Sequence, residues 1–362
     1  GAAFAVDRRI GDTGRQESVR DPYSGAALAF DRSARLDGDR IFVRKRTPLT
    51  PMPDRFDVVV FRSPTDPDER VIKRLVGRPG EHVALVDGDV FVRPATGTGP
   101  PMAPTWNEPG WSIARKPDDV QRTVWQPVFD AAYTHPNAES SLGPWSPATD
   151  GWAASTKPVA RYTGAGGTAL VWDTDRWEIR DRSAYNDVDD RRDQRTGDGG
   201  RRSGLPPYYP VSDLRVAFGL EPTPDTDRVE FRLGARSTEF SFAIDGVGRD
   251  ARITLRSRPA VLDHTGDPPD WAELGSGAAD IARDRVTLVE FWHVDQQLSV
   301  FLDGRLALRT AYDWAVRERV ERSIPGGSFD DLTDITDGHN GLSTPGAYQV
   351  PELAILLEGP AA

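Results

Sequence analysis

The sequence predicts an all-β protein with two parts, a small β unit and a larger antiparallel β-sandwich of the jelly-roll, concanavalin-like type. Short runs rich in Val, Ile, Leu and Phe recur along the chain, and turn residues separate them. Gly and Pro number 34 and 30 among 362 residues, which suits a fold with many turns. This length is sufficient for about two domains, each with its own core.

The small β unit is expected over residues 38–93. Its expected strands are Arg40–Val43, Asp57–Phe61, Val71–Val76, Val83–Val86 and Asp89–Val92. Between the last two, Asp87-Gly88 predicts a tight hairpin turn, because such a turn needs positive φ angles that Gly adopts freely. Residues 1–37 are polar and weakly patterned, so we interpret them as an irregular insertion segment. Residues 94–110 contain Gly and Pro without periodicity and are interpreted as a linker.

The β-sandwich is expected over residues 111–358. Its expected strands are Thr168–Trp172, Leu214–Leu220, Val229–Leu233, Glu239–Ile244, Arg252–Leu255, Val286–Val294 and Leu298–Leu302. Many strands at this spacing, with little helix between them, are typical of two packed sheets. Only Asp313–Ser323 has a helical pattern. The mixed-charge stretch Asp187–Gly204 is expected to be a surface loop.

Composition excludes several classes of function. The chain has no cysteine, so it has no disulfide, thiolate nucleophile or Cys-ligated metal. A formal net charge of −11 argues against nucleic acid as a partner, since nucleic-acid binding needs concentrated positive charge. The longest apolar runs, such as Leu353–Leu357, are far shorter than the roughly 20 residues of a membrane helix. The 5 histidines lack metal-ligand spacing, and we expect neither a metal nor a cofactor.

One residue in the small unit has the character of a general base. Only a lysine that loses its proton can act as a base, and burial among apolar groups lowers the pKa of an ammonium group. Lys73 lies in an expected strand between apolar neighbours that include Val71 and Ile72, so we expect these to shelter its ammonium group. Arginine could not replace it, because a guanidinium keeps its proton in proteins. Lys73 could equally point into solvent from an edge strand.

Three stretches in fixed order carry a family resemblance: Gly38–Lys45, Arg70–Glu81 and Val90–Val92. The first matches the pattern Gly-Asp-hydrophobic-hydrophobic-Val-x-Lys. The second matches Lys-Arg-x-x-Gly-x-Pro-Gly-Asp, with Glu81 in place of the usual Asp and Arg78 in place of the usual Leu. The third has Phe91 in place of the usual Tyr. Together they resemble the signal peptidase I family, the serine/lysine endopeptidases that cleave leader peptides.

The resemblance implies roles for three residues. Lys73 matches the general base of the Ser/Lys dyad, and Val71 and Ile72 match the strand along which the leader peptide binds. It further implies a membrane-associated enzyme of protein secretion at the outer face of the cytoplasmic membrane, anchored through segments absent from this chain. Secretory leader peptides would be its substrates. We expect Arg74 to pair with a carboxylate.

The family's nucleophile is missing from the sequence. Its Ser-Met-x-Pro-Thr-Leu motif does not occur, and Phe30 stands where the serine is expected. The late Gly-Asp-Asn-Ser motif is missing as well. Either this chain is a piece of a longer serine peptidase, with the serine before Gly1, or it is a degenerate relative. In both cases we expect the chain alone to be inactive, because a base without a nucleophile has nothing to activate.

The sandwich offers the alternative function of a non-catalytic glycan- or protein-binding scaffold. The stretch 286–304 resembles a hairpin of laminin-G and concanavalin-like sandwiches. Indole rings can stack on sugars. The candidate tryptophans are Trp145, Trp152, Trp172, Trp177 and Trp292. The alternation of the strand that holds Trp292 equally fits a core position.

Overall fold

The protein is all-β and divides into two compact units in a computed structural model. The small unit comprises Phe30–Trp125 and Asp313–Glu318, and the sandwich unit comprises Gly1–Ala29, Gln126–Tyr312 and Arg319–Ala362. The structure describes residues 18–20, 27–29, 42–45, 51–86, 88–95, 109–133, 142–154, 159–164, 166–174, 179, 211–247, 250–260, 268–283, 285–323 and 352–358.

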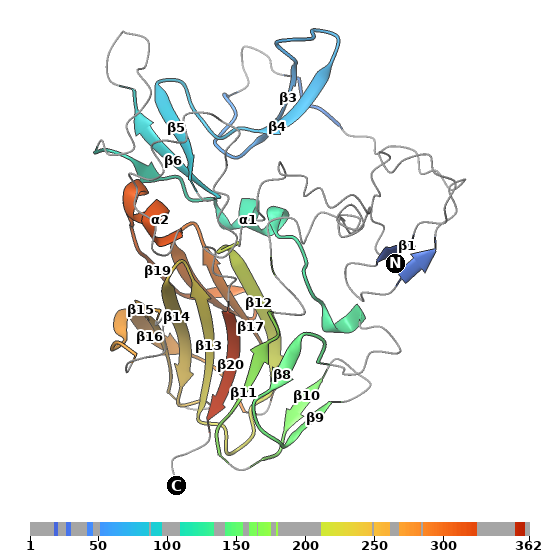
Figure 1. The fold of residues 1–362 in the computed structure, drawn as a ribbon, viewed down its shortest axis with the longest axis vertical. Helices are drawn as coiled ribbons and strands as arrows, with labels where there is room; N and C mark the ends of the chain where they lie inside the picture. The colour runs from blue at the N-terminus through green and yellow to red at the C-terminus, as the bar shows by residue number, and fades with distance from the viewer. Residues whose placement is uncertain are drawn as a thin grey trace, which may run out of the picture. The chain divides into compact units, whose positions relative to one another are not determined.

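The small unit contains two separate antiparallel sheets (Figure 1). Its elements are β3 (Val58–Arg62), β4 (Arg70–Arg74), β5 (Glu81–Val86), β6 (Asp89–Pro94), β7 (Ser112–Ile113) and α1 (Asp118–Val124). Strands β3 and β4 pair as a two-stranded hairpin, and β5, β6 and β7 form a three-stranded sheet. The expected β5–β6 hairpin is confirmed, and Gly88 has a φ of 88° in its turn.

The sandwich unit is built from a seven-stranded and a four-stranded antiparallel sheet. The seven-stranded sheet has the order β16 (Ala272–Ala279), β15 (Ala251–Pro259), β14 (Thr238–Asp245), β13 (Arg228–Ala235), β20 (Glu352–Glu358), β11 (Thr168–Trp172) and β8 (Trp145–Pro147). The four-stranded sheet has the order β12 (Leu214–Leu220), β17 (Thr287–Val294), β18 (Gln297–Leu302) and β19 (Arg305–Ala311). The late strand β20 therefore lies between β13 and β11, in the interior of the larger sheet (Figure 1).

Alternating apolar residues bring the two sheets face to face. Phe291 of β17 lies against Phe231 of β13 and Phe242 of β14, with ring centroids 5.4 and 5.5 Å apart. Because side chains along a strand alternate between faces, these rings share one interior layer. All three side chains are at least 98% buried, with exposed fractions of 0–2%.

Tight turns fix the hairpins of the sandwich. The β17–β18 turn consists of Asp295 and Gln296, with φ angles of 49° and 56°. The β18–β19 turn consists of Asp303 and Gly304, with φ angles of 49° and 77°. Positive φ at both turn residues matches the right-handed twist of the flanking strands, so each turn sets the register of its hairpin.

The remaining described elements are short. They are β1 (Ser18–Arg20), β2 (Ala27–Ala29), η1 (Ala131–Tyr133), β9 (Trp152–Ala154), β10 (Ala160–Tyr162) and α2 (Val316–Ser323). The expected helix over Asp313–Ser323 is present as α2, three residues shorter at its start. Among the described residues, no helix is long and apolar enough to cross a membrane.

Some expectations from the sequence differ from the structure. Phe42 and Val43, placed in an expected first strand, have no regular structure, and both side chains are exposed. Helix α1 was not expected, and neither were strands β16 and β19. The expected loop at 187–204 and most of the expected linker at 94–110 lie outside the described residues. The domain boundaries at residues 37, 93 and 110 stay predictions.

Candidate functional site

Lys73 lies on β4, the second strand of the β3–β4 hairpin. It is directly opposite Val59, and Val71 lies directly opposite Phe61. Because alternate residues share a face, Lys73, Val59, Val71 and Phe61 project from the same face of the hairpin. Ile72 projects from the other face. The residues named as the site from the sequence are therefore adjacent on one strand but divided between its two faces.

The structure does not show the shelter expected for the Lys73 ammonium group. Lys73 is exposed, Ile72 is 48% exposed, and Val71 is half-buried. The reason lies in the sheet: among the described residues β4 pairs only with β3, and a two-stranded ribbon has no second layer to cover its faces. Apolar residues on this hairpin are therefore accessible to solvent: Val58 is 59% exposed and Phe61 is 42% exposed.

The second edge of β4 has no strand paired with it in the described part of the chain. An unpaired edge presents a row of backbone N–H and C=O groups. Such an edge can accept an extended peptide as an additional strand. Exposed apolar side chains beside it are typical of an interaction surface. In the described part of the chain, the β3–β4 hairpin thus has an unpaired edge with exposed apolar side chains beside it.

Polar contacts fix the end of the hairpin next to Lys73. Arg74, expected to pair with a carboxylate, instead donates from Nη1 to the backbone oxygen of Phe56 at 2.5 Å. Arg55 donates from Nη2 to both carboxylate oxygens of Glu81 at 2.6 and 2.8 Å. Glu81 also accepts a hydrogen bond from the backbone N–H of Arg78 at 2.8 Å. The hydrogen bond from Arg55, followed by that from the Arg78 N–H, lowers the pKa of Glu81.

The expectation that Trp292 is a core residue agrees with its burial, since none of its surface is exposed. Its Nε1 donates to Glu290 at 2.9 Å. Of the other candidate tryptophans, Trp172 is buried, and Trp145 and Trp152 are half-buried. Trp177 lies outside the described residues.

His293 is the centre of a buried polar cluster in the sandwich unit. Its Nδ1 lies 2.5 Å from the backbone oxygen of Ser212, and its Nε2 lies 2.7 Å from the Tyr312 hydroxyl. A carbonyl can only accept, so Nδ1 carries the proton and the Tyr312 hydroxyl donates to Nε2. Burial lowers the pKa of His293 to about 4, although the charge of Asp213 and the Ser212 contact act to raise it.

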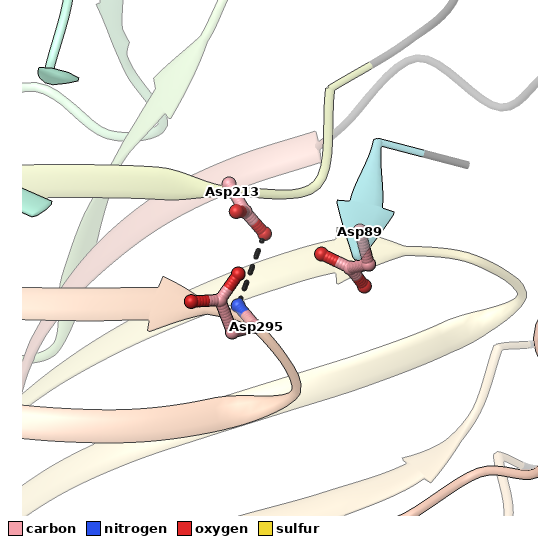
Figure 2. A group of neighbouring side chains, drawn as sticks. All are labelled: Asp89, Asp213 and Asp295. Carbon is pink, nitrogen blue, oxygen red and sulfur yellow. Dashed lines mark hydrogen bonds between the residues drawn. The ribbon is translucent and has the colours of Figure 1, made fainter. Parts of the chain in front are cut away.

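Asp213 also receives a hydrogen bond within the sandwich unit. Its Oδ1 accepts a long hydrogen bond from the backbone N–H of Asp295 at 3.4 Å (Figure 2). Asp213 directly precedes β12, and Asp295 is in the β17–β18 turn. The contact therefore ties the start of one strand to the turn after its neighbour.

Comparison with known proteins gives sequence matches to part of the chain and several weak structural likenesses. Residues 32–128 match the family model described as signal peptidase, peptidase S26. This segment resembles the signal peptidases. Over 70 residues the chain is 41% identical to signal peptidase I of Rickettsia rickettsii (strain Sheila Smith) and 39% identical to that of Rickettsia prowazekii (strain Madrid E). The aligned region covers 19% of this chain and 24% of each relative, so the chain spans about a quarter of their length.

The matched residues nearly coincide with the small unit's main segment, Phe30–Trp125. The family resemblance expected from the sequence is thus confirmed for this part of the chain. The sequence proposed Lys73, Val71 and Ile72 as site residues through their motif, and these roles stay predictions. It gave no indication of the contact between Arg74 and Phe56, because that contact depends on the fold.

Among solved structures, the carbohydrate-binding module CBM66 from Bacillus subtilis aligns with 60% of this chain and 92% of its own, at 6% identity and a TM-score of 0.30. The Crh5 transglycosylase in complex with NAG covers 62% of this chain and 82% of its own, at 10% identity and a TM-score of 0.28. Likenesses at these scores carry no argument about function.

Proposed function

We propose that the small unit is part of a signal peptidase I-like serine endopeptidase in which Lys73 is the general base. The single observation that carries this proposal is the S26 match over residues 32–128, which contains the Lys73 motif. The edge of β4 that is unpaired in the described residues supports it, since a leader peptide can add there as an extended strand beside Val71 and Ile72, which project from the two faces of the sheet.

The proposal sets a condition on the lysine. A general base works best where water is excluded, and Lys73 is exposed in the described structure. The bound leader peptide and the segment that carries the nucleophilic serine must therefore cover the face formed by Val59, Phe61 and Val71. Closure over these apolar side chains removes water and places the lysine amine against the serine hydroxyl, whose proton it accepts.

The substrates in this proposal are secretory leader peptides with a small residue before the scissile bond, cleaved at the outer face of the cytoplasmic membrane. The serine comes from outside the printed residues, because its family motif does not occur in them. The chain as printed should therefore bind a leader peptide without cleaving it.

The test is cleavage of a leader peptide by the protein expressed from its complete gene. Lys73→Ala should reduce kcat/KM by about 10²–10⁴-fold, the contribution typical of a positioned general base. Lys73→Arg should be equally inactive, since a guanidinium keeps its proton. The matched control is Arg70→Ala, which removes an exposed cation from the other end of the same strand. A Lys73→Arg enzyme with normal turnover, or a complete protein that cleaves no leader peptide, contradicts the proposal.

A second candidate function is glycan binding by the sandwich unit. The observation that favours it is the pair Trp152 and Tyr162, which face each other across β9 and β10 with ring centroids 5.4 Å apart. Both side chains are half-buried, so part of each ring is accessible. A glycan array should then show saturable binding that Trp152→Ala abolishes and Trp292→Phe leaves intact. Absence of binding across a broad array excludes this function.

A further inference from the structure

The apolar pattern of the β3–β4 hairpin does not define which face Lys73 occupies. Val58, Val60 and Ile72 project from one face, and Val59, Phe61 and Val71 project from the other. A one-residue slip between two strands transfers every side chain of one strand to the opposite face of the pair. When one face is apolar and the other polar, the slip is unfavourable. Here both faces carry apolar side chains as well as cations, with Arg62, Arg70 and Arg74 on one face and Lys73 on the other. Burial of apolar side chains therefore opposes the slip only weakly.

The connection between the two strands is also a weak constraint. It runs from Ser63 to Glu69, and the backbone N–H of Ser63 donates to the Glu69 oxygen at 3.0 Å. A connection of this length differs from a two-residue turn, whose geometry dictates the register of its hairpin. The register must therefore be fixed mainly at the other end, where β3 begins and β4 ends.

At that end Phe56 has an unusual backbone conformation. Its φ is 73°, a left-handed value that is unfavourable for a bulky residue, and its side chain is only 3% exposed. Its N–H donates to the Leu75 oxygen at 2.6 Å, and the Leu75 N–H donates to the Asp57 oxygen at 2.9 Å. The oxygen of Phe56 accepts the 2.5 Å hydrogen bond from Arg74. This conformation is thus held by both its backbone groups and by burial of its ring.

A second guanidinium reinforces the same end. Arg55 donates from Nη1 to the backbone oxygen of Val76 at 2.5 Å while its Nη2 binds Glu81. Three consecutive residues of β4 and its extension, Arg74, Leu75 and Val76, are therefore each bonded to a residue of the segment that leads into β3. A slip of one residue would break all of these contacts together.

We propose that Arg74 and the Arg55–Glu81 pair form a register lock, which places Lys73 on the face with Val59, Phe61 and Val71. Arg74 is then a positioning residue for the proposed general base, and this catalytic meaning rests on the proposed function. The register itself does not depend on catalysis and can be measured without it.

The test uses disulfide formation in a chain that has no cysteine of its own. The pair Val60→Cys with Ile72→Cys reports the register of the structure, in which the two residues are directly opposite. The pairs Val60→Cys with Val71→Cys and Val60→Cys with Lys73→Cys report the two possible slips. In the native register these slipped pairs project from opposite faces, and cysteines whose Cβ atoms point apart do not form a bridge.

Each pair is oxidised in four backgrounds: unchanged, Arg74→Gln, Glu81→Gln and the control Arg70→Gln. We expect Arg74→Gln and Glu81→Gln to lower the yield of the native bridge by about three-fold or more and to produce a slipped bridge, while Arg70→Gln changes neither. Native yields equal to the control in both lock variants overturn the proposal. If Arg74→Gln proves unfolded by circular dichroism, Glu81→Gln decides by the same criterion.

This experiment separates the two proposals. If Arg74→Gln and Glu81→Gln change the register but the complete protein cleaves no leader peptide, only the peptidase function is refuted. A protein that cleaves leader peptides but keeps its register in both lock variants refutes only the lock. Replacement of Arg74 by Lys should restore the native bridge in part, because an ammonium can still donate to the Phe56 oxygen.

Discussion

Acidification should destabilise the sandwich unit through one buried residue, His293. Its imidazole is fully buried and neutral, with the Ser212 oxygen and the Tyr312 hydroxyl as its partners. Burial lowers its pKa from 6.5 to about 4, while in the unfolded chain the ordinary value applies. The unfolded state therefore binds more protons between these two values. Stability is fully present above pH 6.5 and is lost as the pH falls toward 4.

The size of the loss follows from the two pKa values. For one group, proton linkage gives about 2 kcal/mol of lost stability at about pH 5 relative to about pH 7.5. Few carboxylates titrate in that interval, so this contribution can be separated from acid denaturation. The side-chain contacts explain the loss as well: a protonated ring no longer accepts from Tyr312, and it places a positive charge near Arg319 and Arg236.

The assay is urea unfolding followed by tryptophan fluorescence at both pH values. Wild type should lose about 2 kcal/mol, and His293→Gln, although less stable throughout, should show no such dependence on pH. His82→Gln on β5 is the matched control and should retain the wild-type loss. The reasoning is refuted if wild type and His293→Gln lose the same stability over this interval.

Two further predictions concern the sandwich unit. Glu230 is 1% exposed; burial alone would raise its pKa, but hydrogen bonds from Arg232, Ser241 and Arg228 lower it to about 2. Glu230→Ala should cost about 1–3 kcal/mol in urea unfolding, since the buried Ser241 hydroxyl and the part-buried Arg228 and Arg232 lose this acceptor, whereas Arg285→Ala at an exposed ion pair should cost clearly less. Equal costs would contradict this. Ser237→Gly should raise the free energy of unfolding by about 0.5–1 kcal/mol, because Ser237 has a φ of 53° in a hairpin turn; a lower thermal midpoint would disprove it.

The sequence predicted strands best where β-branched and aromatic residues alternate. Strands β11 and β12 have the expected bounds, and β13, β14 and β17 differ by one or two residues at their ends. In β11 and β12 more buried and more accessible positions alternate, so packing imposes a period of two on the sequence. Strands β14 and β17 are buried on both faces, and their aromatic and β-branched residues indicate them instead. The β17–β18 hairpin was expected because two strand-like runs are separated by a few polar residues, and Asp295 and Gln296 form its turn.

Strands β16 and β19 were missed because their stability comes from distant contacts. The sequence of β16, Ala-Glu-Leu-Gly-Ser-Gly-Ala-Ala, is rich in small residues of low strand propensity. Its glycines lie next to β19: a Cβ at Gly275 would be 3.5 Å from Thr310 and one at Gly277 would be 3.4 Å from Leu308, both ordinary packing distances. Thr310 also donates to the Leu274 oxygen at 3.0 Å. Local patterns contain none of this information.

The candidate site was likewise predicted only in part from the sequence. Lys73 was proposed from a motif of several residues around it, and its role as a base stays a prediction; the strand that holds it was expected from Val71 and Ile72 and is present. The lock was not predictable, because Arg55 and Glu81 are 26 positions apart and both are ordinary surface residue types. Phe56 gave no signal either, since Phe has no preference for a left-handed backbone.

The place of β20 has a consequence for folding. Glu352–Glu358 bridge the two halves of the seven-stranded sheet, although they are far along the chain from β11 and β13. Until this distant segment pairs, β11 and β13 each lack one neighbour, and their unsatisfied backbone groups can recruit other chains. The insertion of β20 is therefore the step that protects a folding molecule from self-association.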